Sequence, residues 1–458
     1  MTALQVDLDL VKKYNVAGPR YTSYPPATKF TDTVGWDAVA LRIEENNRTP
    51  RDLSIYVHIP FCETLCWFCG CTTVITRDHG KGHAYVEALG REMATMARHL
   101  HPDRKAVQVH LGGGSPTFLL PDELRRLGEL LHEHFTFSDD VEASVEVDPR
   151  RLTRDHMAAL AEAGFNRASM GVQDLDPAVQ EAIHRIQPPE MTRQAIDWMR
   201  ELGYSSINLD LIYGLPHQTP ASFDRTVDAI LEMDPDRLAV FSYAHVPWIK
   251  PAQRILEEKV LPSPESKLAV LELVIEKLTA GDRYVYIGMD HFAKPEDELA
   301  VAQREKRLQR NFQGYSTRAG SDIYAFGMSG ISQTPDAYWQ NEKELGGWRD
   351  AVDAGRVPLH RAYLVTEEDK IRRETIMRTM CDLSLDFGAM SRALGIDFER
   401  HFAKELASLA PLEADGLVVR TPSGLTVTDA GRLFIRNVAM CFDDTLAPLG
   451  ERTHSKTI

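Results

Sequence analysis

Four cysteines fall within one ten-residue stretch, CETLCWFCGC, at positions 62 to 71. Thiolates are the protein ligands of iron–sulfur clusters, and the spacing of Cys62, Cys66 and Cys69 lets a single loop reach three corners of a cubane cluster. The fourth iron then keeps no protein ligand and stays open to a cofactor. This stretch therefore predicts a [4Fe-4S] cluster with one free coordination position.

A structural zinc site is the alternative for the same cysteines. Closed four-thiolate zinc sites usually join two short cysteine hairpins separated by roughly a dozen or more residues, and the sequence has no second hairpin. Cys381 and Cys441 stand alone, so we expect small, buried, apolar side chains there. If Cys71 were also a ligand, it would occupy the free coordination position of the fourth iron. We expect it beside the cluster or near a substrate, and a simply packed thiol is an equal alternative.

Short β-rich runs alternate with helical patterns from about residue 53, at the spacing of repeated βα units. The runs cover 53–60, 106–111, 142–147, 167–172, 206–212 and 237–243. Helical patterns include 83–100, 122–134, 154–163, 193–202 and 222–233. Such repeats predict an α/β fold, a partial (βα)6 barrel with a parallel sheet inside its helices, although the pattern also fits an open doubly wound sheet.

The polar motifs follow the carboxyl ends of these predicted strands. Barrels and open α/β sheets both place their active sites at that edge. In strand order, the motifs are the cysteine stretch, Gly112-Gly113-Gly114-Ser115-Pro116, Glu146 with Asp148, Gln173, Asp210 with Tyr213-Gly214-Leu215-Pro216, and Ala244 with His245. We therefore predict a single site to which several strands contribute.

The pattern changes after about residue 262. A long amphipathic helix is expected at 265–280, and a glycine-rich stretch then runs to residue 332. From about residue 360, helices and one hairpin around Pro422-Ser423-Gly424 predict a winged-helix-like cap. We expect an N-terminal arm at 1–50, a catalytic domain at 51–360 with its βα repeats at 53–246, and a mostly helical C-terminal domain at 361–458.

The composition is that of a globular protein. Of the 458 residues, 43% are hydrophobic and 26% are charged. The formal net charge of -15 argues against a general nucleic-acid partner, because sequence-independent phosphate binding needs a basic surface. No apolar run is long enough to cross a bilayer and the start lacks a secretory signal, so we expect a cytoplasmic protein without a membrane partner.

The three cysteines after the first strand and the glycine run after the second resemble the radical S-adenosylmethionine superfamily. Four further segments narrow the resemblance to the oxygen-independent coproporphyrinogen III oxidase family. They are Gly18-Pro19-Arg20-Tyr21-Thr22-Ser23-Tyr24-Pro25, Cys69-Gly70-Cys71, Gly288-Met289-Asp290-His291-Phe292-Ala293 and Asn311-Phe312-Gln313-Gly314-Tyr315. The resemblance covers nearly the whole chain, as far as Cys441-Phe442-Asp443.

The resemblance implies an enzyme of haem biosynthesis. In this family, one electron from the cluster cleaves S-adenosylmethionine, and the resulting 5'-deoxyadenosyl radical takes hydrogen from propionate side chains of coproporphyrinogen III. Loss of carbon dioxide from two of them leaves the vinyl groups of protoporphyrinogen IX. The resemblance also implies two molecules of S-adenosylmethionine, a one-electron donor such as a flavodoxin or ferredoxin, and a monomer.

The family pattern assigns roles to individual residues. By resemblance, the S-adenosylmethionine on the cluster would contact Gly113, Glu146 and Ile331. A second molecule would lie among Gly114, Ser115, Gln173, Arg185, Asp210 and Ala244. Tyr56 and Phe68 resemble the aromatic cofactor contacts of the family, where a ring can pack on adenine. The family often has threonine where Ser115 stands, and that change keeps the hydroxyl.

A substrate with four carboxylates needs local positive charge in an acidic protein. The candidates are Arg20, Lys294, Arg307, Arg310 and Arg318. Arg20 comes first because it lies in the arm segment that marks the family, whereas Arg307 and Arg310 also fit plain surface charge. Asp290 and His291 are candidates for a proton-handling pair. Neighbouring residues on a strand point in opposite directions, however, which argues against direct contact.

Two other functions fit parts of the sequence. A non-catalytic relative that binds and delivers haem would need only the barrel and the three cysteines. Cys71, the Arg20 segment and residues 311–315 favour the oxidase over it. A zinc-dependent barrel hydrolase is the second alternative, and it predicts zinc and no brown colour in protein purified without air.

Overall fold

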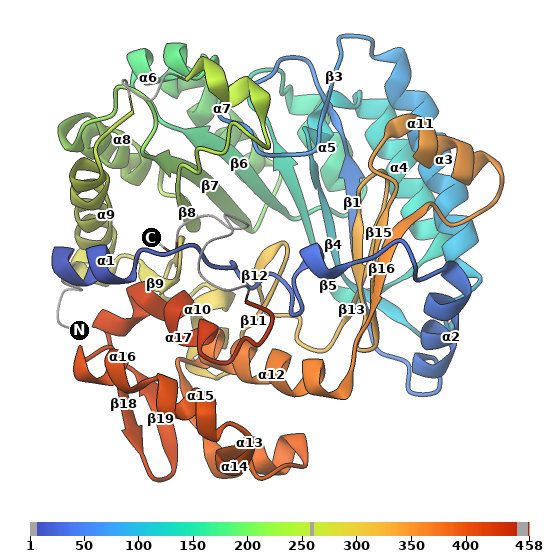
Figure 1. The fold of residues 1–458 in the computed structure, drawn as a ribbon. Helices are drawn as coiled ribbons and strands as arrows, with labels where there is room; N and C mark the ends of the chain where they lie inside the picture. The colour runs from blue at the N-terminus through green and yellow to red at the C-terminus, as the bar shows by residue number, and fades with distance from the viewer. Residues whose placement is uncertain (1–6, 257–260, 447–456, 458) are drawn as a thin grey trace.

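A curved sheet of twelve strands forms the centre of the molecule (Figure 1). The computed structural model describes residues 7–256, 261–446 and 457. Six neighbouring strands are parallel: β1 (Leu53–Ile59), β4 (Lys105–Gly113), β5 (Thr136–Val147), β6 (Arg167–Gln173), β7 (Ser206–Tyr213) and β8 (Arg237–Ser242). They are the six predicted strands. These six strands are neighbours in the same order as in the chain, whereas a doubly wound sheet reverses its strand order. The two end strands of the sheet, β16 and β9, do not pair with each other within the described residues, so the barrel is not closed. The predicted partial barrel is confirmed.

Helices cover the outer face of the parallel strands (Figure 1). They are α3 (Gly80–Ala97), α4 (Pro121–His134), α5 (Arg154–Glu162), α6 (Pro177–Ala182), α7 (Pro189–Glu201) and α8 (Pro220–Met233). Thr153 caps α5 by accepting a hydrogen bond from His156 N, as its position before the helix predicts. The helix predicted at 193–202 begins earlier, at Pro189, because proline is tolerated in the first turn of a helix. The short α6 was not predicted.

The parallel strands bury apolar side chains on one face and polar side chains on the other. Along β1, Ile55, Val57 and Ile59 belong to the hydrophobic core, and the alternate positions carry Ser54, Tyr56 and His58. The polar face is joined across strands, since Ser54 Oγ donates to Gln108 Oε1 at 2.8 Å and Gln108 Nε2 donates to Glu142 Oε1 at 3.1 Å. The barrel therefore has a polar inner face, on which polar ligands can be bound.

Further strands widen the sheet on both sides. β13 (Asp322–Phe326) pairs in parallel with β1, and the antiparallel strands β14 (Ile331–Gln333), β15 (Ala337–Asn341) and β16 (Leu359–Leu364) follow it. On the other side, the hairpin of β9 (Val285–Gly288) and β10 (His291–Ala293) pairs with β8. β13 was not predicted, because all five of its residues are buried and it shows no alternation.

The remaining elements belong to the arm, the sides of the barrel and a C-terminal module, which we define as residues 365–446. The arm holds α1 (Leu8–Tyr14) and α2 (Trp36–Asn46), and the sides hold β2 (Phe61–Cys62), β3 (Val74–Ile75), α9 (Pro264–Thr279), α10 (Glu298–Arg304), β11 (Gln309–Asn311), β12 (Gly314–Ser316) and α11 (Leu345–Asp353). The module comprises α12 (Glu367–Asp382), β17 (Ser384–Asp386), α13 (Phe387–Leu394), α14 (Phe398–His401), α15 (Ala403–Ser408), α16 (Ala410–Ala414), β18 (Val418–Thr421), β19 (Gly424–Val427) and α17 (Ile435–Met440). The expected hairpin is β18–β19, and β17 pairs with β19 beside it.

The arm runs across the molecule from α1, beside the C-terminal module, to α2, beside β15 and β16 (Figure 1). Its tyrosines bind the module, because Tyr21 Oη donates to Asp443 at 2.9 Å and Tyr24 Oη donates to Asp444 at 2.6 Å. Arg436 Nε donates to Pro19 O at 2.9 Å.

The division of the chain into domains at residues 50 and 360 stays a prediction. None of the helices in the described ranges has the length and apolarity needed to cross a membrane.

Candidate active site

The cysteine loop leaves the sheet at the end of β1 and is held at both ends by β2 and β3. These two strands pair in parallel, with Phe61 opposite Val74 and Cys62 opposite Ile75. Within the loop, Cys69 N donates to Cys66 O at 3.1 Å. The thiols of Cys62, Cys66 and Cys69 are therefore carried by backbone that is hydrogen-bonded at its base and in its middle.

Segments that follow β6 and β8 anchor the outer part of the loop. Trp67 N donates to Ile183 O at 3.1 Å, and the Trp67 ring stacks on His184 with centroids 5.0 Å apart. Lys250 Nζ donates to Cys71 O at 2.8 Å. The loop thus depends on contacts from both the β1 side and the β8 side of the barrel.

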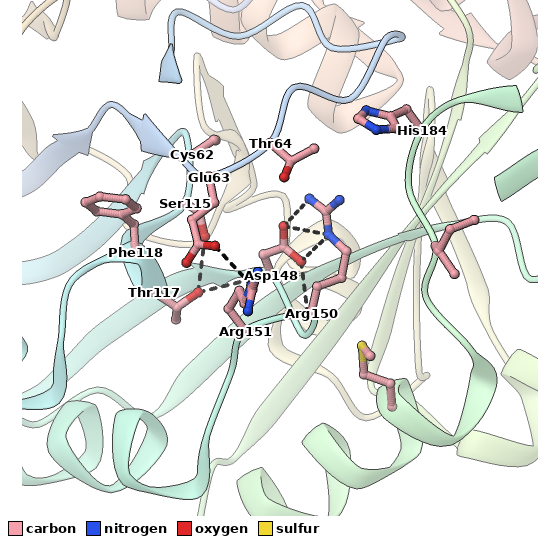
Figure 2. Close-up of a pocket in the computed structure, with 12 residues that line it drawn as sticks. Cys62, Glu63, Thr64, Ser115, Thr117, Phe118, Asp148, Arg150, Arg151 and His184 are labelled. Carbon is pink, nitrogen blue, oxygen red and sulfur yellow. Dashed lines mark hydrogen bonds and ion pairs between the residues drawn. The ribbon is translucent and has the colours of Figure 1, made fainter. Parts of the chain in front are cut away.

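Two arginines face the sulfur of Cys66. Arg150 Nη2 and Arg185 Nη1 lie 3.5 and 3.7 Å from Cys66 Sγ. Both guanidiniums also bind Asp148, and Figure 2 shows Asp148 and Arg150 beside a cavity of about 320 Å³ that Cys62 and Ser115 also line. Burial would raise the pKa of Asp148, but Arg185 and Arg150 lower it to about 2. The ionised Asp148 carboxylate therefore holds two positively charged guanidinium groups next to the Cys66 sulfur.

The other thiols differ in acidity. Burial raises the pKa of Cys62 to about 12, so this thiol is protonated until a metal replaces the proton. Hydrogen bonds from Cys71 lower the pKa of Cys69 to about 6, and the same contact holds the pKa of Cys71 well above its ordinary value. Cys71 is exposed, and its N–H lies 3.4 Å from Cys69 Sγ.

The donor set of this loop fits an iron–sulfur cluster. Three thiols come from one loop, as the ligands of a cluster do, and guanidinium N–H groups face one of them. Within the described ranges, no three His, Cys, Asp or Glu side chains converge closely enough for a single metal ion. The closed zinc site that we considered needs four ligands around one ion, and the described residues do not provide such a group.

The glycine run at the end of β4 packs directly against the strand that leads into the cysteine loop. Gly114 N donates to Ile59 O at 2.8 Å, and Ser115 N donates to Phe61 O at 2.9 Å. A Cβ on Gly114 would lie 2.7 Å from the backbone of Pro60. Gly113 has φ +119°, and a Cβ there would lie 2.6 Å from the His58 ring. Only glycine allows the two segments to approach this closely.

Glu146 joins the glycine run to aromatic rings of the inner face. Its carboxylate accepts a hydrogen bond from Gly113 N at 3.0 Å and lies 3.4 Å from His110 Nε2. The His110 ring stacks on Tyr56 with centroids 5.9 Å apart. Burial would raise the pKa of Glu146, but His110 and the Gly113 N–H bring it below its ordinary value. An ionised carboxylate beside stacked rings suits a ligand with an ammonium or hydroxyl group and an adenine.

Arg185 and Gln173 lie close together at the end of β6. Arg185 is 7% exposed and donates to Gly171 O at 2.7 Å, so it is not the solvated helix end that its local sequence alone suggests. Gln173 is buried and has φ +71°. A Cβ on Gly171 would lie 2.5 Å from Gln173 Nε2. Because Arg185 also reaches Asp148 and Cys66, it connects this part of the site to the cysteine loop.

Asp210 lies on β7 and points to the same inner face. Asn208 Nδ2 donates to it at 2.7 Å, and Ser169 Oγ donates at 3.3 Å. Burial raises the pKa of Asp210 to about 7, although both hydrogen bonds act in the opposite direction. The carboxyl group is therefore poised between its two protonation states near neutral pH.

Three of the predicted cofactor contacts lie at the rim. Phe68 is partly buried in a small apolar cluster that includes Ile183 and Leu215. Ala244 is exposed just after β8. Ile331 begins β14, which is antiparallel to β13, so it lies at the edge where the parallel strands end.

Of the five basic candidates for substrate binding, two lie together. The Arg20 guanidinium pairs with Asp290, and Arg310 Nε donates to Arg20 O at 3.2 Å. Arg310 is 3% exposed, which contradicts its interpretation as surface charge.

The other three basic candidates are placed elsewhere. Lys294 pairs with Asp234 at 3.0 Å. It follows Ala293, which pairs with the first residue of β8, so Lys294 lies at the edge of the sheet opposite to the cysteine loop. Arg318 pairs with Asp140 at 2.9 Å, and Arg307 is an exposed partner of Glu305.

Asp290 and His291 take different partners. Asp290 pairs with Arg20, whereas the His291 ring contacts Phe241 and Tyr315 at centroid distances of 5.9 and 5.4 Å. Burial and the charge of Arg310 lower the pKa of His291 to about 3. His291 is therefore neutral at physiological pH, and the two side chains do not form a direct pair.

Cys381 and Cys441 behave as structural residues. Cys381 is fully buried, with Sγ 3.6 Å from Met377 Sδ, and the half-buried Cys441 bonds Asn437 O at 3.6 Å. The predicted burial is confirmed for Cys381, whereas Cys441 is only partly buried.

Sequence reasoning missed Arg150 and His110. Arg150 directly follows Asp148 and Pro149 at the end of β5, so its position after a strand was an available signal. His110 alternates with buried apolar residues between Gln108 and Gly112, which places all three on the inner face.

Comparisons with known proteins agree with this geometry. The Radical SAM superfamily model matches residues 56–230, and the HemN C-terminal domain model matches residues 365–434. The chain is 43% identical to an oxygen-independent coproporphyrinogen III oxidase of Pseudomonas aeruginosa over 100% of both chains, and 46% identical to that of Escherichia coli over 97% of both. The solved coproporphyrinogen III oxidase of Escherichia coli, titled a radical SAM enzyme, superposes with a TM-score of 0.92 at 44% identity, over 97% of this chain and 100% of that one.

Proposed function

The chain belongs to the oxygen-independent coproporphyrinogen III oxidases of the radical S-adenosylmethionine superfamily, and from this premise we propose how its residues act. It is an oxidoreductase of haem biosynthesis that converts two propionate side chains of coproporphyrinogen III into vinyl groups. Its cofactors are a [4Fe-4S] cluster and S-adenosylmethionine. When bound, they supply a 5'-deoxyadenosyl radical that can take hydrogen from an unactivated carbon.

Cys62, Cys66 and Cys69 hold the cluster in this proposal. The hydrogen-bonded base of the loop fixes the thiols, and Arg150 and Arg185 balance the negative charge of the Cys66 sulfur. Cys71 stays outside the ligand set, because a fourth thiolate would occupy the position that the cofactor needs.

The first S-adenosylmethionine lies between the glycine run and the inner face. Gly113 lets the ligand approach the backbone, the Glu146 carboxylate binds its polar groups, and Tyr56 and Ile331 enclose its apolar part. The hydrogen bond of 3.0 Å between Gly113 N and Glu146 supports this arrangement, because it joins both residues at one place.

A second S-adenosylmethionine occupies the side towards β6, β7 and β8. Gly114, Ser115, Gln173, Arg185, Asp210 and Ala244 surround it, and Phe68 packs at the rim. A guanidinium and a carboxylate suit a ligand that carries both a carboxylate and an ammonium group.

We also assign a cytoplasmic location, a monomeric state, and a flavodoxin or ferredoxin as electron donor.

The observation that carries the proposal is the direct bonding of the glycine run to the cysteine strand, through Gly114 N and Ser115 N. The test is anaerobic reconstitution with iron and sulfide, chemical reduction, and assay with S-adenosylmethionine in the presence and absence of coproporphyrinogen III. We expect brown protein and vinyl product. Cofactor cleavage without vinyl product, or haem binding alone, would favour the haem-delivery relative. A colourless, zinc-containing protein would favour the hydrolase.

Asp210 makes the affinity for S-adenosylmethionine dependent on pH. Because burial raises the pKa of Asp210 to about 7, the carboxylate forms as the pH rises through neutrality, and a cationic ligand then binds more tightly. Between pH 6 and pH 8, we expect affinity at the second site to rise by up to about 10-fold, following the ionised fraction. Calorimetric titration at both pH values measures this.

The Asp210→Asn variant should bind weakly and equally at the two pH values. Asp139→Asn, at an exposed position on β5, is the matched control and should keep the wild-type dependence. A pH dependence that survives in Asp210→Asn would show that another group is responsible.

A further inference from the structure

Arg310 is a buried arginine that forms no ion pair with a carboxylate in the described ranges. It is 3% exposed, its Nε donates to Arg20 O, and its Nη1 has no hydrogen-bond partner within the described residues. The guanidinium lies over the ring of Tyr315, 4.8 Å from the centroid. A buried charge with an unmet hydrogen-bond donor is costly, and a bound ligand is one partner that can complete it.

The neighbours of Arg310 also have open polar atoms. Tyr315 Oη, His291 Nδ1 and Gln313 Nε2 are buried and lack partners within the part of the chain that the structure describes. The His291 and Tyr315 rings are 5.4 Å apart. Tyr315 Oη lies close to Gly288, where a Cβ would approach it to 2.7 Å. The unmet hydrogen-bonding groups of Tyr315 and His291 therefore lie beside each other and close to Arg310.

The local charge is positive. The guanidiniums of Arg20 and Arg310 both lie near the Asp290 carboxylate, and Asp290 forms its ion pair with Arg20. Burial lowers the pKa of Arg436 to about 10. The positive charges of Arg20 and Arg310 also lower this pKa, whereas the negative charge of Asp290 raises it. Among the described residues Arg310 is thus left without an ion pair of its own, and a bound anion would supply one.

This region adjoins the inner face of the barrel. Arg310 and Tyr315 lie on β11 and β12, and the turn between these strands carries Phe312. The Phe312 ring packs edge-on against Tyr56 of β1, with centroids 5.6 Å apart. A ligand near Tyr56 can therefore extend along the hairpin to Arg310.

We propose that Arg310 and Tyr315, with Arg20 at the entrance, bind the carboxylate of a propionate side chain that the enzyme does not remove. The inference rests on the proposed function, whose substrate carries four carboxylates and keeps two. A guanidinium matches a carboxylate in shape and charge, and the Tyr315 hydroxyl adds a donor. The site anchors the substrate at a distance from the reacting carbon.

The test is equilibrium binding of coproporphyrin III, the stable oxidised tetracarboxylate, to the full chain without oxygen, with thermal unfolding measured in parallel. Arg310→Met should weaken binding by about 10- to 100-fold, the range for a charged hydrogen bond. Tyr315→Phe should weaken it by about 3- to 10-fold without loss of stability, because the hydroxyl has no partner to lose among the residues that the structure describes. Arg307→Met, at the exposed arginine on the same segment, should bind as the wild type does.

Several outcomes would overturn the proposal. One is wild-type binding by a folded Tyr315→Phe or Arg310→Met variant. Another is a loss of S-adenosylmethionine affinity in place of coproporphyrin affinity, which would assign the anion site to the cofactor. If Arg310→Met does not fold, Tyr315→Phe alone decides. A wild-type chain that makes no vinyl product would instead refute the proposed function, and the anchor with it.

Discussion

Replacing Cys66 by alanine should yield protein without iron and sulfide, and turnover of coproporphyrinogen III should fall below about one-thousandth of the wild-type rate. That loss corresponds to about 4 kcal/mol of transition-state stabilisation. Cys66 is the most buried cysteine of the loop, and Arg150 and Arg185 both face its sulfur. Without the sulfur, one corner of the cluster has no ligand, and the two guanidiniums keep Asp148 but no longer face a sulfur. Iron and sulfide analysis, absorbance and product assays measure the effect.

Cys71→Ala is the matched control, because it removes a thiol two residues beyond Cys69 without removing a proposed ligand. It should keep iron and sulfide. Cys381→Ala, far from the loop, should do the same. An active Cys66→Ala variant, or a cluster-free Cys71→Ala variant, would show that we have assigned the wrong set of ligands.

The parallel strands could be predicted because their sequences carry two signals. Residues such as Ile55, Val57 and Ile59 mark the buried face, and polar residues occupy the alternate positions. β13 has neither signal, since Asp322–Phe326 is buried throughout and lies within a glycine-rich stretch. Its place beside β1 comes from tertiary packing, which no local pattern encodes.

The site could be predicted where function depends on spacing in the chain. The cysteine stretch and the glycine run each occupy one loop, so their chemistry is visible locally. Arg310 shows the limit of this reasoning, because a single arginine in a basic segment looks like surface charge. Its burial depends on the arm at Arg20 and on Tyr315, and those contacts exist only in the folded chain.

Replacing Gly114 by alanine should lower both stability and activity, because it separates the two loops that form the cofactor site. The new Cβ would lie 2.7 Å from Pro60 C and O and 2.8 Å from Phe61 O. These are backbone atoms, so they cannot rotate away, and relief requires β1 and β4 to move apart. Such overpacking costs about 1 to 3 kcal/mol. A displacement of about 1 Å at reacting groups can cost about 100-fold in rate.

Thermal unfolding and the rate of S-adenosylmethionine cleavage test this prediction together. Gly346→Ala is the matched control, since a Cβ there meets nothing within 4 Å in helix α11, and alanine should be neutral or stabilise by up to about 1 kcal/mol. Because Gly114 N bonds Ile59 O and Ser115 N bonds Phe61 O, the alanine should also weaken iron retention. If Gly114→Ala lowers stability but leaves iron content and cleavage unchanged, the glycine run supports only the fold. Loss of all three would show that the cysteine loop and the cofactor-binding turn are held in place by the same close contact.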